Sequence, residues 1–210
     1  DVDEGTLYVQ EGTYQKISIS GKNITLKCLS QSNDGCIIDA KNNGSAITIY
    51  NVSGQIEISG FKIMNGNAPS GAGISISDSK VVIDSCAIYD NIAGSHGGGI
   101  YITGGDSDCL ISNTEVRNNE ASNGAGIYIE GEIFNPISIE MTNVAIQNND
   151  ANLQNGLGGG IYTTNSENRL QGSLISDNKS KHGGGINAKD IISLNINFST
   201  FSENFAVENG

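Results

Sequence analysis

Apolar residues through most of the chain recur in four columns, separated by spacings of two, three and two residues. In the clearest copy the columns hold Val81, Ile83, Cys86 and Ile88. A spacing of two is the alternation of a β-strand, whose successive side chains point to opposite faces. The spacing of three marks a two-residue corner, here the turn-forming pair Asp84-Ser85. Other copies of the pattern end at Ile63, Val116, Ile146, Ile175 and Phe201. Each copy predicts two short strands joined at a corner.

A glycine-rich segment follows each strand pair and introduces a third strand, as in the run His96-Gly97-Gly98-Gly99-Ile100-Tyr101-Ile102. The isoleucines that follow the glycines are Ile74, Ile100, Ile127, Ile161 and Ile186, which lie 26, 27, 34 and 25 residues apart. This period is typical of a solenoid with one unit per copy. No segment with helical periodicity joins the strands, so the coils must stack strand on strand. The pattern predicts an all-β, right-handed parallel β-helix of about seven coils, each with three short strands.

The repeats indicate a single domain over residues 1–210. Residues 1–53 would form less regular N-terminal coils, whereas residues 54–210 carry the regular repeats. The sequence ends within a repeat, after Asn204-Phe205-Ala206. Because an open solenoid end exposes unpaired strands, we expect a fragment of a longer protein, flanked by contiguous coils or caps.

An asparagine follows the strand pair in most copies. The five asparagines in this column are Asn91, Asn119, Asn149, Asn178 and Asn204. Asparagine tolerates left-handed backbone angles, and its amide can bond to the backbone and to the coil above. The column therefore predicts a structural ladder along the solenoid, with Asp90 and Asp177 beside it as turn caps.

The four cysteines fall into two classes. Cys28 and Cys36 flank a short polar loop, which suits a local disulfide in an oxidising compartment. Cys86 and Cys109 fall in different columns, so their side chains should lie too far apart to bond. We expect both to be free and buried, as small apolar residues.

Charge and hydropathy exclude some classes of function. The net charge of −12 argues against nucleic acid and against electrostatic docking on anionic membranes. No apolar run approaches the length of a membrane-spanning helix. We therefore expect no nucleic-acid partner and no membrane insertion by this segment.

The paired motifs resemble the repeats of chlamydial polymorphic membrane proteins and their bacterial relatives. That family carries Phe-x-x-Asn together with Gly-Gly-Ala followed by an aliphatic residue. Phe201-Ser202-Glu203-Asn204 matches the first motif, and Gly97-Gly98-Gly99-Ile100 is a variant of the second. The resemblance covers about residues 54–210, and the first fifty residues resemble N-terminal coils of the pectin-lyase-like superfamily. It implies a secreted or cell-surface adhesin or scaffold whose partner is a surface glycan or protein.

The middle residues of the third strands are candidates for ligand binding. Tyr101, Tyr128 and Tyr162 should point outward on consecutive coils and form an exposed aromatic row. Such a row is a suitable platform for sugar rings. The alternative is that the rings stack between coils and only stabilise the sheet.

Candidate catalytic and metal-binding residues are sparse. Asp106 and Asp108 have a spacing that suits calcium, the one metal we consider; no other cofactor is expected. Polysaccharide lyases and hydrolases share the fold class implied by the resemblance, and they need a convergent acid–base cluster. Arg117 and Arg169 lie in different columns, so we assign no catalytic residue. A polysaccharide-active enzyme remains the alternative to an adhesin.

Overall fold

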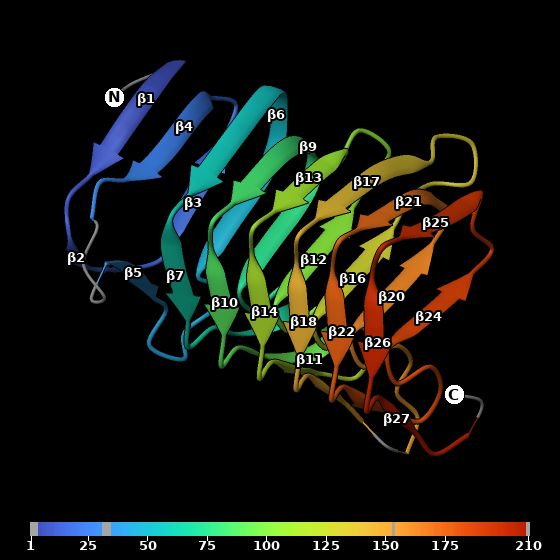
Figure 1. The fold of residues 1–210 in the computed structure, drawn as a ribbon. Coiled ribbons are helices and arrows are strands. Elements are labelled where there is room, and N and C mark those ends of the chain that lie inside the picture. The colour runs from blue at the N-terminus through green and yellow to red at the C-terminus, as the bar shows by residue number, and fades with distance from the viewer. Residues whose placement is uncertain (1–3, 31–34, 153, 209–210) are drawn as a thin grey trace.

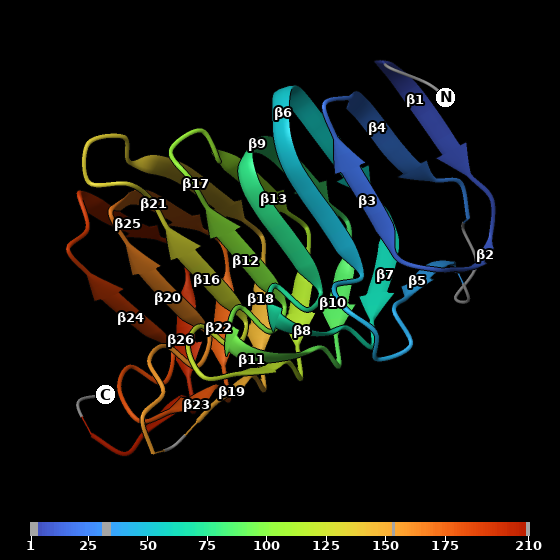
Figure 2. The same cartoon turned by 180° about the vertical axis from the view of Figure 1, so that it is seen from behind.

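The computed structural model describes residues 4–30, 35–152 and 154–208, and it shows a parallel β-solenoid of about 7 turns (Figure 1). The chain winds with the right-handed sense of a β-helix. Strands of successive turns pair in parallel and form three sheets of 13, 8 and 6 strands (Figure 2). The first two sheets begin in the N-terminal turns, and the six-stranded sheet begins at β8. The predicted fold is confirmed.

The largest sheet contains two strands from most turns. Its strands are β1 (Glu4–Val9), β3 (Ile17–Ser20), β4 (Asn23–Cys28), β6 (Ile47–Ser59), β9 (Ile74–Asp84), β12 (Ile100–Thr103), β13 (Cys109–Ser112), β16 (Ile127–Glu130), β17 (Ile137–Thr142), β20 (Ile161–Thr164), β21 (Ser166–Gln171), β24 (Ile186–Lys189) and β25 (Ser193–Asn197). The predicted third strand of one turn and the first strand of the next share this sheet. In β6 and β9 they fuse into one continuous strand, contrary to the prediction of separate short strands.

The second sheet corresponds to the predicted second strands. It consists of β2 (Gly12–Tyr14), β5 (Cys36–Asp39), β7 (Phe61–Met64), β10 (Ala87–Tyr89), β14 (Glu115–Arg117), β18 (Ala145–Gln147), β22 (Leu174–Ser176) and β26 (Thr200–Ser202). At the corner before these strands the second residue takes a left-handed conformation, as at Ser85 (φ 54°) and Asn113 (φ 47°). The predicted two-residue corner is therefore correct.

The third sheet was not predicted as strands. It consists of β8 (Asn67–Ser70), β11 (Ile92–His96), β15 (Glu120–Ala121), β19 (Asp150–Ala151), β23 (Lys179–Ser180) and β27 (Phe205–Ala206). These strands are short, and their inward residues are small. Ala93, Ala121 and Ala151 belong to a separate alanine cluster, which lets the chain pass close to the core at this edge.

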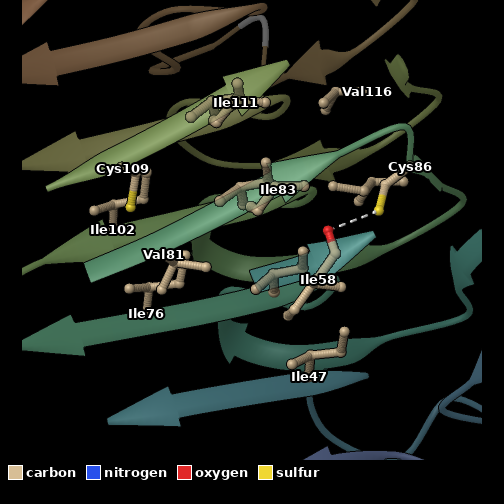
Figure 3. Packing of buried hydrophobic residues seen from close by; sticks show 14 of the residues in the cluster. Ile47, Ile58, Ile76, Val81, Ile83, Cys86, Ile102, Cys109, Ile111 and Val116 are labelled. Carbon is tan, nitrogen blue, oxygen red and sulfur yellow. Dashed lines mark hydrogen bonds between the residues drawn. The ribbon is translucent and has the colours of Figure 1, made fainter. Parts of the chain in front are cut away.

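The core is a set of aliphatic columns that follow the strand register. Ile58 pairs with Ile83 and Ile83 with Ile111, so their side chains stack along the solenoid (Figure 3). All three are fully buried. Each such burial stabilises the fold by about 1.5–3 kcal/mol, which makes these columns its main support.

The asparagine ladder is present; Asn91, Asn119, Asn149 and Asn178 are fully buried, and Asn204 is half-buried. The Asn91 side chain donates to Asn119 Oδ1 at 3.0 Å, and each later asparagine bonds to the next in the same way, as far as Asn204. The same Oδ1 atoms accept bonds from backbone amides, for example Asn119 Oδ1 from the Asn91 N–H. The left-handed conformation, however, belongs to the preceding residue, such as Asp90 (φ 55°).

The cysteines form one disulfide and two free, buried thiols, as the sequence predicted. A disulfide joins Cys28 to Cys36; residues 31–34 of the loop between them lie outside the described residues. Cys86 and Cys109 are free and buried, on opposite sides of the Ile83 column (Figure 3). Burial raises the pKa of both thiols to about 12, so neither is a reactive thiolate in the folded protein.

Candidate functional site

The three tyrosines form a stacked row on consecutive turns. Tyr101, Tyr128 and Tyr162 follow one another in the strand register of β12, β16 and β20. The ring centroids of Tyr101 and Tyr128 are 5.5 Å apart, and those of Tyr128 and Tyr162 are 4.9 Å apart, in stacked geometry. None of the three belongs to the central core, so the row lies outside it as predicted.

The prediction that this row is exposed is wrong for Tyr128 and Tyr162, whereas Tyr101 is half-buried. Tyr128 and Tyr162 are only 7% and 8% exposed. Each ring covers the face of its neighbour, and the glycine turns lie against the tyrosines: a Cβ at Gly124 would lie 2.9 Å from the Tyr128 Cβ. A sugar needs a free ring face, and Tyr128 offers none because it is stacked between Tyr101 and Tyr162. The stacking favours the structural alternative, and ligand binding at this row stays a prediction.

His96 closes one side of the tyrosine row. Its ring centroid is 4.4 Å from that of Tyr128, and its Nδ1 is 2.9 Å from the Ser95 hydroxyl. Burial lowers the pKa of His96, whereas the Glu130 carboxylate opposes this shift. Burial also raises the pKa of Tyr128, whose hydroxyl donates to Glu130 Oε2 at 3.4 Å. The His96 and Tyr128 side chains are therefore neutral packing partners at pH 7.

The two candidate calcium ligands have different surroundings. Asp108 accepts a 2.8 Å hydrogen bond from the Ser138 N–H and lies 3.6 Å from Lys80 Nζ. Asp106 lines a neighbouring hollow together with Asp78. Within residues 4–30, 35–152 and 154–208, no three His, Cys, Asp or Glu side chains gather as a metal site would require. Calcium binding at this pair stays a prediction.

An open groove crosses the outer face of the largest sheet. One hollow, of about 220 Å³, lies over β17, β21 and β25. Its polar lining consists of Ser138, Glu140, Glu167, Arg169, Ser193 and Asn195. These residues form two outward columns, because Glu140 pairs with Arg169 and Ser138 with Glu167 in the strand register.

A second hollow extends this groove toward the N-terminus. It also measures about 220 Å³, and it shares Ser138 and Glu140 with the first. Lys80, Asp108 and Leu110 line its other side. We refer to the two together as the sheet groove, defined by Lys80, Asp108, Leu110, Ser138, Glu140, Glu167, Arg169, Ser193 and Asn195.

The sheet groove carries charges of both signs that the fold leaves available. Among the described residues, none of the ion pairs includes Glu140, Glu167 or Arg169. Sequence reasoning missed this set because it compared Arg169 only with Arg117 and not with the carboxylates of neighbouring turns. The signal was present in the sequence. In successive turns, the position one residue before the inward column that contains Ile111 is occupied by Leu110, Glu140, Arg169 and Asn195.

Comparison with known proteins supports the fold. Residues 72–210 match the family model described as "Right handed beta helix region". Neither the curated proteins nor the solved structures include a match to this chain.

No described segment is a helix that is both long and apolar enough to cross a membrane. The matched residues contain the asparagine ladder. The inward aliphatic columns and the parallel sheets pass through the matched residues and continue toward the N-terminus. On the match over residues 72–210, the chain belongs to the right-handed β-helix family.

Proposed function

We propose that this β-helix is an adhesin or scaffold domain that works outside the cell, secreted or at the cell surface, and that its sheet groove binds carbohydrate. The sheet groove is the observation that carries the proposal. It is a shallow, elongated surface that crosses several turns, which suits an extended chain of sugar units better than a compact ligand.

The chemistry of the groove suits a hydroxyl-rich ligand. Glu140 and Glu167 offer acceptors, and Arg169 offers a planar set of donors. Hydrogen bonds to charged groups of this kind are stronger than those between neutral groups. Leu110, at 37% exposure, offers an apolar contact for the C–H face of a sugar.

Two further features support an extracellular setting. The disulfide between Cys28 and Cys36 is of a kind that persists in oxidising compartments. The net charge of −12 keeps a long, flat surface soluble and disfavours adsorption on anionic polymers. Both agree with the surface role implied by the repeat motifs.

Affinity electrophoresis on a panel of neutral and acidic polysaccharides, with and without calcium, tests the proposal. We expect the wild-type chain to be retained by at least one polymer. Arg169→Ala should weaken retention at least fivefold, because it removes the main donor of the groove. Arg117→Ala is a matched control, since Arg117 lies on the second sheet over Tyr89. Equal retention of wild type and Arg169→Ala would remove the groove from the proposal.

A polysaccharide-active enzyme is the second candidate, and one observation favours it. Glu140, Glu167 and Arg169 border a single hollow, so two carboxylates and a cation could act on one glycosidic linkage. The same incubation distinguishes the two functions, provided that new chain ends are measured. Retention without new ends supports binding alone. New chain ends that are produced by wild type but not by Glu140→Gln or Glu167→Gln would show that the protein is an enzyme and not an adhesin.

A further inference from the structure

The loop between β16 and β17 carries the most exposed apolar side chain among the described residues, Phe134, directly beside a second exposed one, Ile133. Phe134 is 98% exposed and Ile133 is 76% exposed. They are neighbours at the tip of residues 131–136, which project beyond the strand ends of the largest sheet (Figures 1 and 2). Exposed apolar pairs of this size at a single point are uncommon on a soluble surface unless they meet a partner.

The loop is an addition to the repeat, and the fold does not require it. At the equivalent corner β6 and β9 continue without a break, β20 reaches β21 across Asn165 alone, and residues 104–108 join β12 to β13 without any apolar side chain. A turn that only connected two strands would need neither Ile133 nor Phe134. Their presence therefore calls for a role outside the packing of the solenoid.

The tip is held in one conformation. Glu132 and Asn135 exchange two backbone hydrogen bonds, of 3.3 and 3.2 Å, which close a hairpin around the apolar pair. At its base, the Gly131 N–H donates to the Thr164 carbonyl oxygen at 3.1 Å, and Ile137 is fully buried. A preformed tip loses little conformational freedom when it binds, which favours recognition.

The charges around the tip indicate what kind of partner fits. Glu132 is part of the hairpin, and Glu130 lies at its base. Asp106 lies in the loop of the preceding turn. That loop contacts residues 131–136, since a side chain at Gly105 would collide with the Asn135 amide. The lysines of this edge are already paired, with Lys80 3.6 Å from Asp108 and Lys189 4.0 Å from Asp190. These acidic side chains disfavour binding to anionic lipid and favour a partner whose binding surface is bordered by basic side chains.

We propose that the Ile133–Phe134 tip is a recognition site for a protein partner that presents an apolar pocket bordered by lysine or arginine side chains. Phe134 would fill the pocket as the central anchor, with Glu132 facing the basic rim. This site is separate from the sheet groove, because neither Ile133 nor Phe134 lines it. Its success or failure is therefore independent of carbohydrate binding.

Selection from a phage-displayed single-domain antibody library with randomised loops tests whether the tip is a preferred protein-recognition site. We expect selected clones to be enriched in Lys and Arg and to lose at least tenfold in affinity for Phe134→Ser. They should also weaken for Glu132→Gln and in high salt. Phe198→Ser is the matched control, since Phe198 is 93% exposed but lies at the corner between β25 and β26 and not in this loop. It should change affinity less than twofold.

Two results would overturn the proposal. Clones that bind Phe134→Ser as well as wild type would show that the tip is not a favoured site. Sedimentation of the wild-type chain with phosphatidylcholine vesicles, lost in Phe134→Ser, would assign the tip to a lipid surface instead. Because Phe134 has no packing role, its variant should keep the wild-type melting temperature, which separates loss of binding from loss of folding.

Discussion

Two buried asparagines show how differently the same residue can contribute to this fold. Asn149 accepts from the Asn119 backbone and side chain, and it donates to Val116 O and Asn178 Oδ1. Asn168 donates to the Thr163 and Ser166 hydroxyl oxygens, but its Oδ1 is buried without a hydrogen bond. A buried polar atom without a partner costs about 1–3 kcal/mol. The first asparagine therefore stabilises the solenoid, and the second weakens it.

Replacing both asparagines with leucine should have opposite effects. Asn168 lies in an inward column between Ile139 and Leu194, where leucine fits, and Thr163 and Ser166 can still bond to each other at 2.6 Å. We expect Asn168→Leu to raise the free energy of unfolding by about 1 kcal/mol. Asn149→Leu should lower it by about 3 kcal/mol or more, because several ladder groups lose their partners.

Urea denaturation of the two variants measures this difference. A loss of stability in Asn168→Leu would mean that the amide bonds to Thr163 and Ser166 outweigh the unpaired Oδ1. A neutral Asn149→Leu would mean that water replaces the missing ladder bonds.

The elements that sequence predicted well are those with a strong apolar period. The columns through Ile83 and Ile88 were correct because a one-residue slip would expose every isoleucine of the turn. The short strands around Ala121 were missed because two or three residues carry no period. The fusion of predicted strands in β9 was missed because Asp78 and Ser79 resemble a turn. Asp78 does take a left-handed conformation (φ 46°), but β9 continues through it.

The candidate sites were harder to predict for a related reason. The position of Tyr128 followed from its column, but its burial depends on how closely neighbouring rings and the glycine turn approach. The sheet groove needed the outward register across three turns, for example Glu140 beside Arg169. A single repeat contains only two residues of the groove, such as Glu167 and Arg169, so only alignment of the outward positions of successive repeats brings the set together.

The glycine at the third position of a glycine-rich run allows the close approach of neighbouring turns, as at Gly126. A Cβ at Gly126 would lie 2.5 Å from the Gly160 carbonyl oxygen and 3.0 Å from Ile146 Cγ2. Both neighbours are fixed in the solenoid, so Gly126→Ala should destabilise the protein by about 3 kcal/mol. Gly172→Ala is the control, because its Cβ has open space and only its left-handed backbone (φ 58°) opposes alanine. We expect a loss of about 1 kcal/mol there, and thermal denaturation should rank the two. An equal loss in both would exclude the contact with Gly160 as the cause.

The corner at Asp84 makes the stability of this edge depend on pH. Partial burial opposes ionisation of its carboxylate, but hydrogen bonds from Ser112, Asn113 and Ser85 outweigh this and lower the pKa below its ordinary value of 3.8. The unfolded chain therefore takes up a proton first as the pH falls. The contribution of Asp84 is fully present above pH 3.8 and is lost at lower pH.

Urea denaturation of wild type and Asp84→Asn at several pH values tests this coupling. The variant should be less stable than wild type at pH 7. The difference should shrink as the pH falls below 3.8, where the wild-type carboxylate also becomes protonated. A difference that stays constant down to pH 2 would show that the ionised form of Asp84 contributes no stability.

At the scale of the whole molecule, each turn is supported only by the turns beside it. In such an array, opening begins at an end and reaches the middle last, unless the whole chain unfolds at once. The inward column that contains Cys109, Ile139, Asn168 and Leu194 samples successive turns at the same depth. Cys109 is fully enclosed, whereas Leu194 in β25 has a neighbouring strand on one side only.

Thiol labelling along this column should reveal the order of opening. Cys109 reacts only when its turn opens, because burial raises its thiol pKa to about 12. In a Leu194→Cys variant we expect the new thiol to react with iodoacetamide at least tenfold faster than Cys109, measured peptide by peptide by mass spectrometry. The disulfide between Cys28 and Cys36 is an internal control, since it offers no free thiol. Equal rates at the two positions would contradict opening from the end. They would mean that the turns unfold as one cooperative unit, because the asparagine ladder and the aliphatic columns couple them too strongly for any turn to open alone.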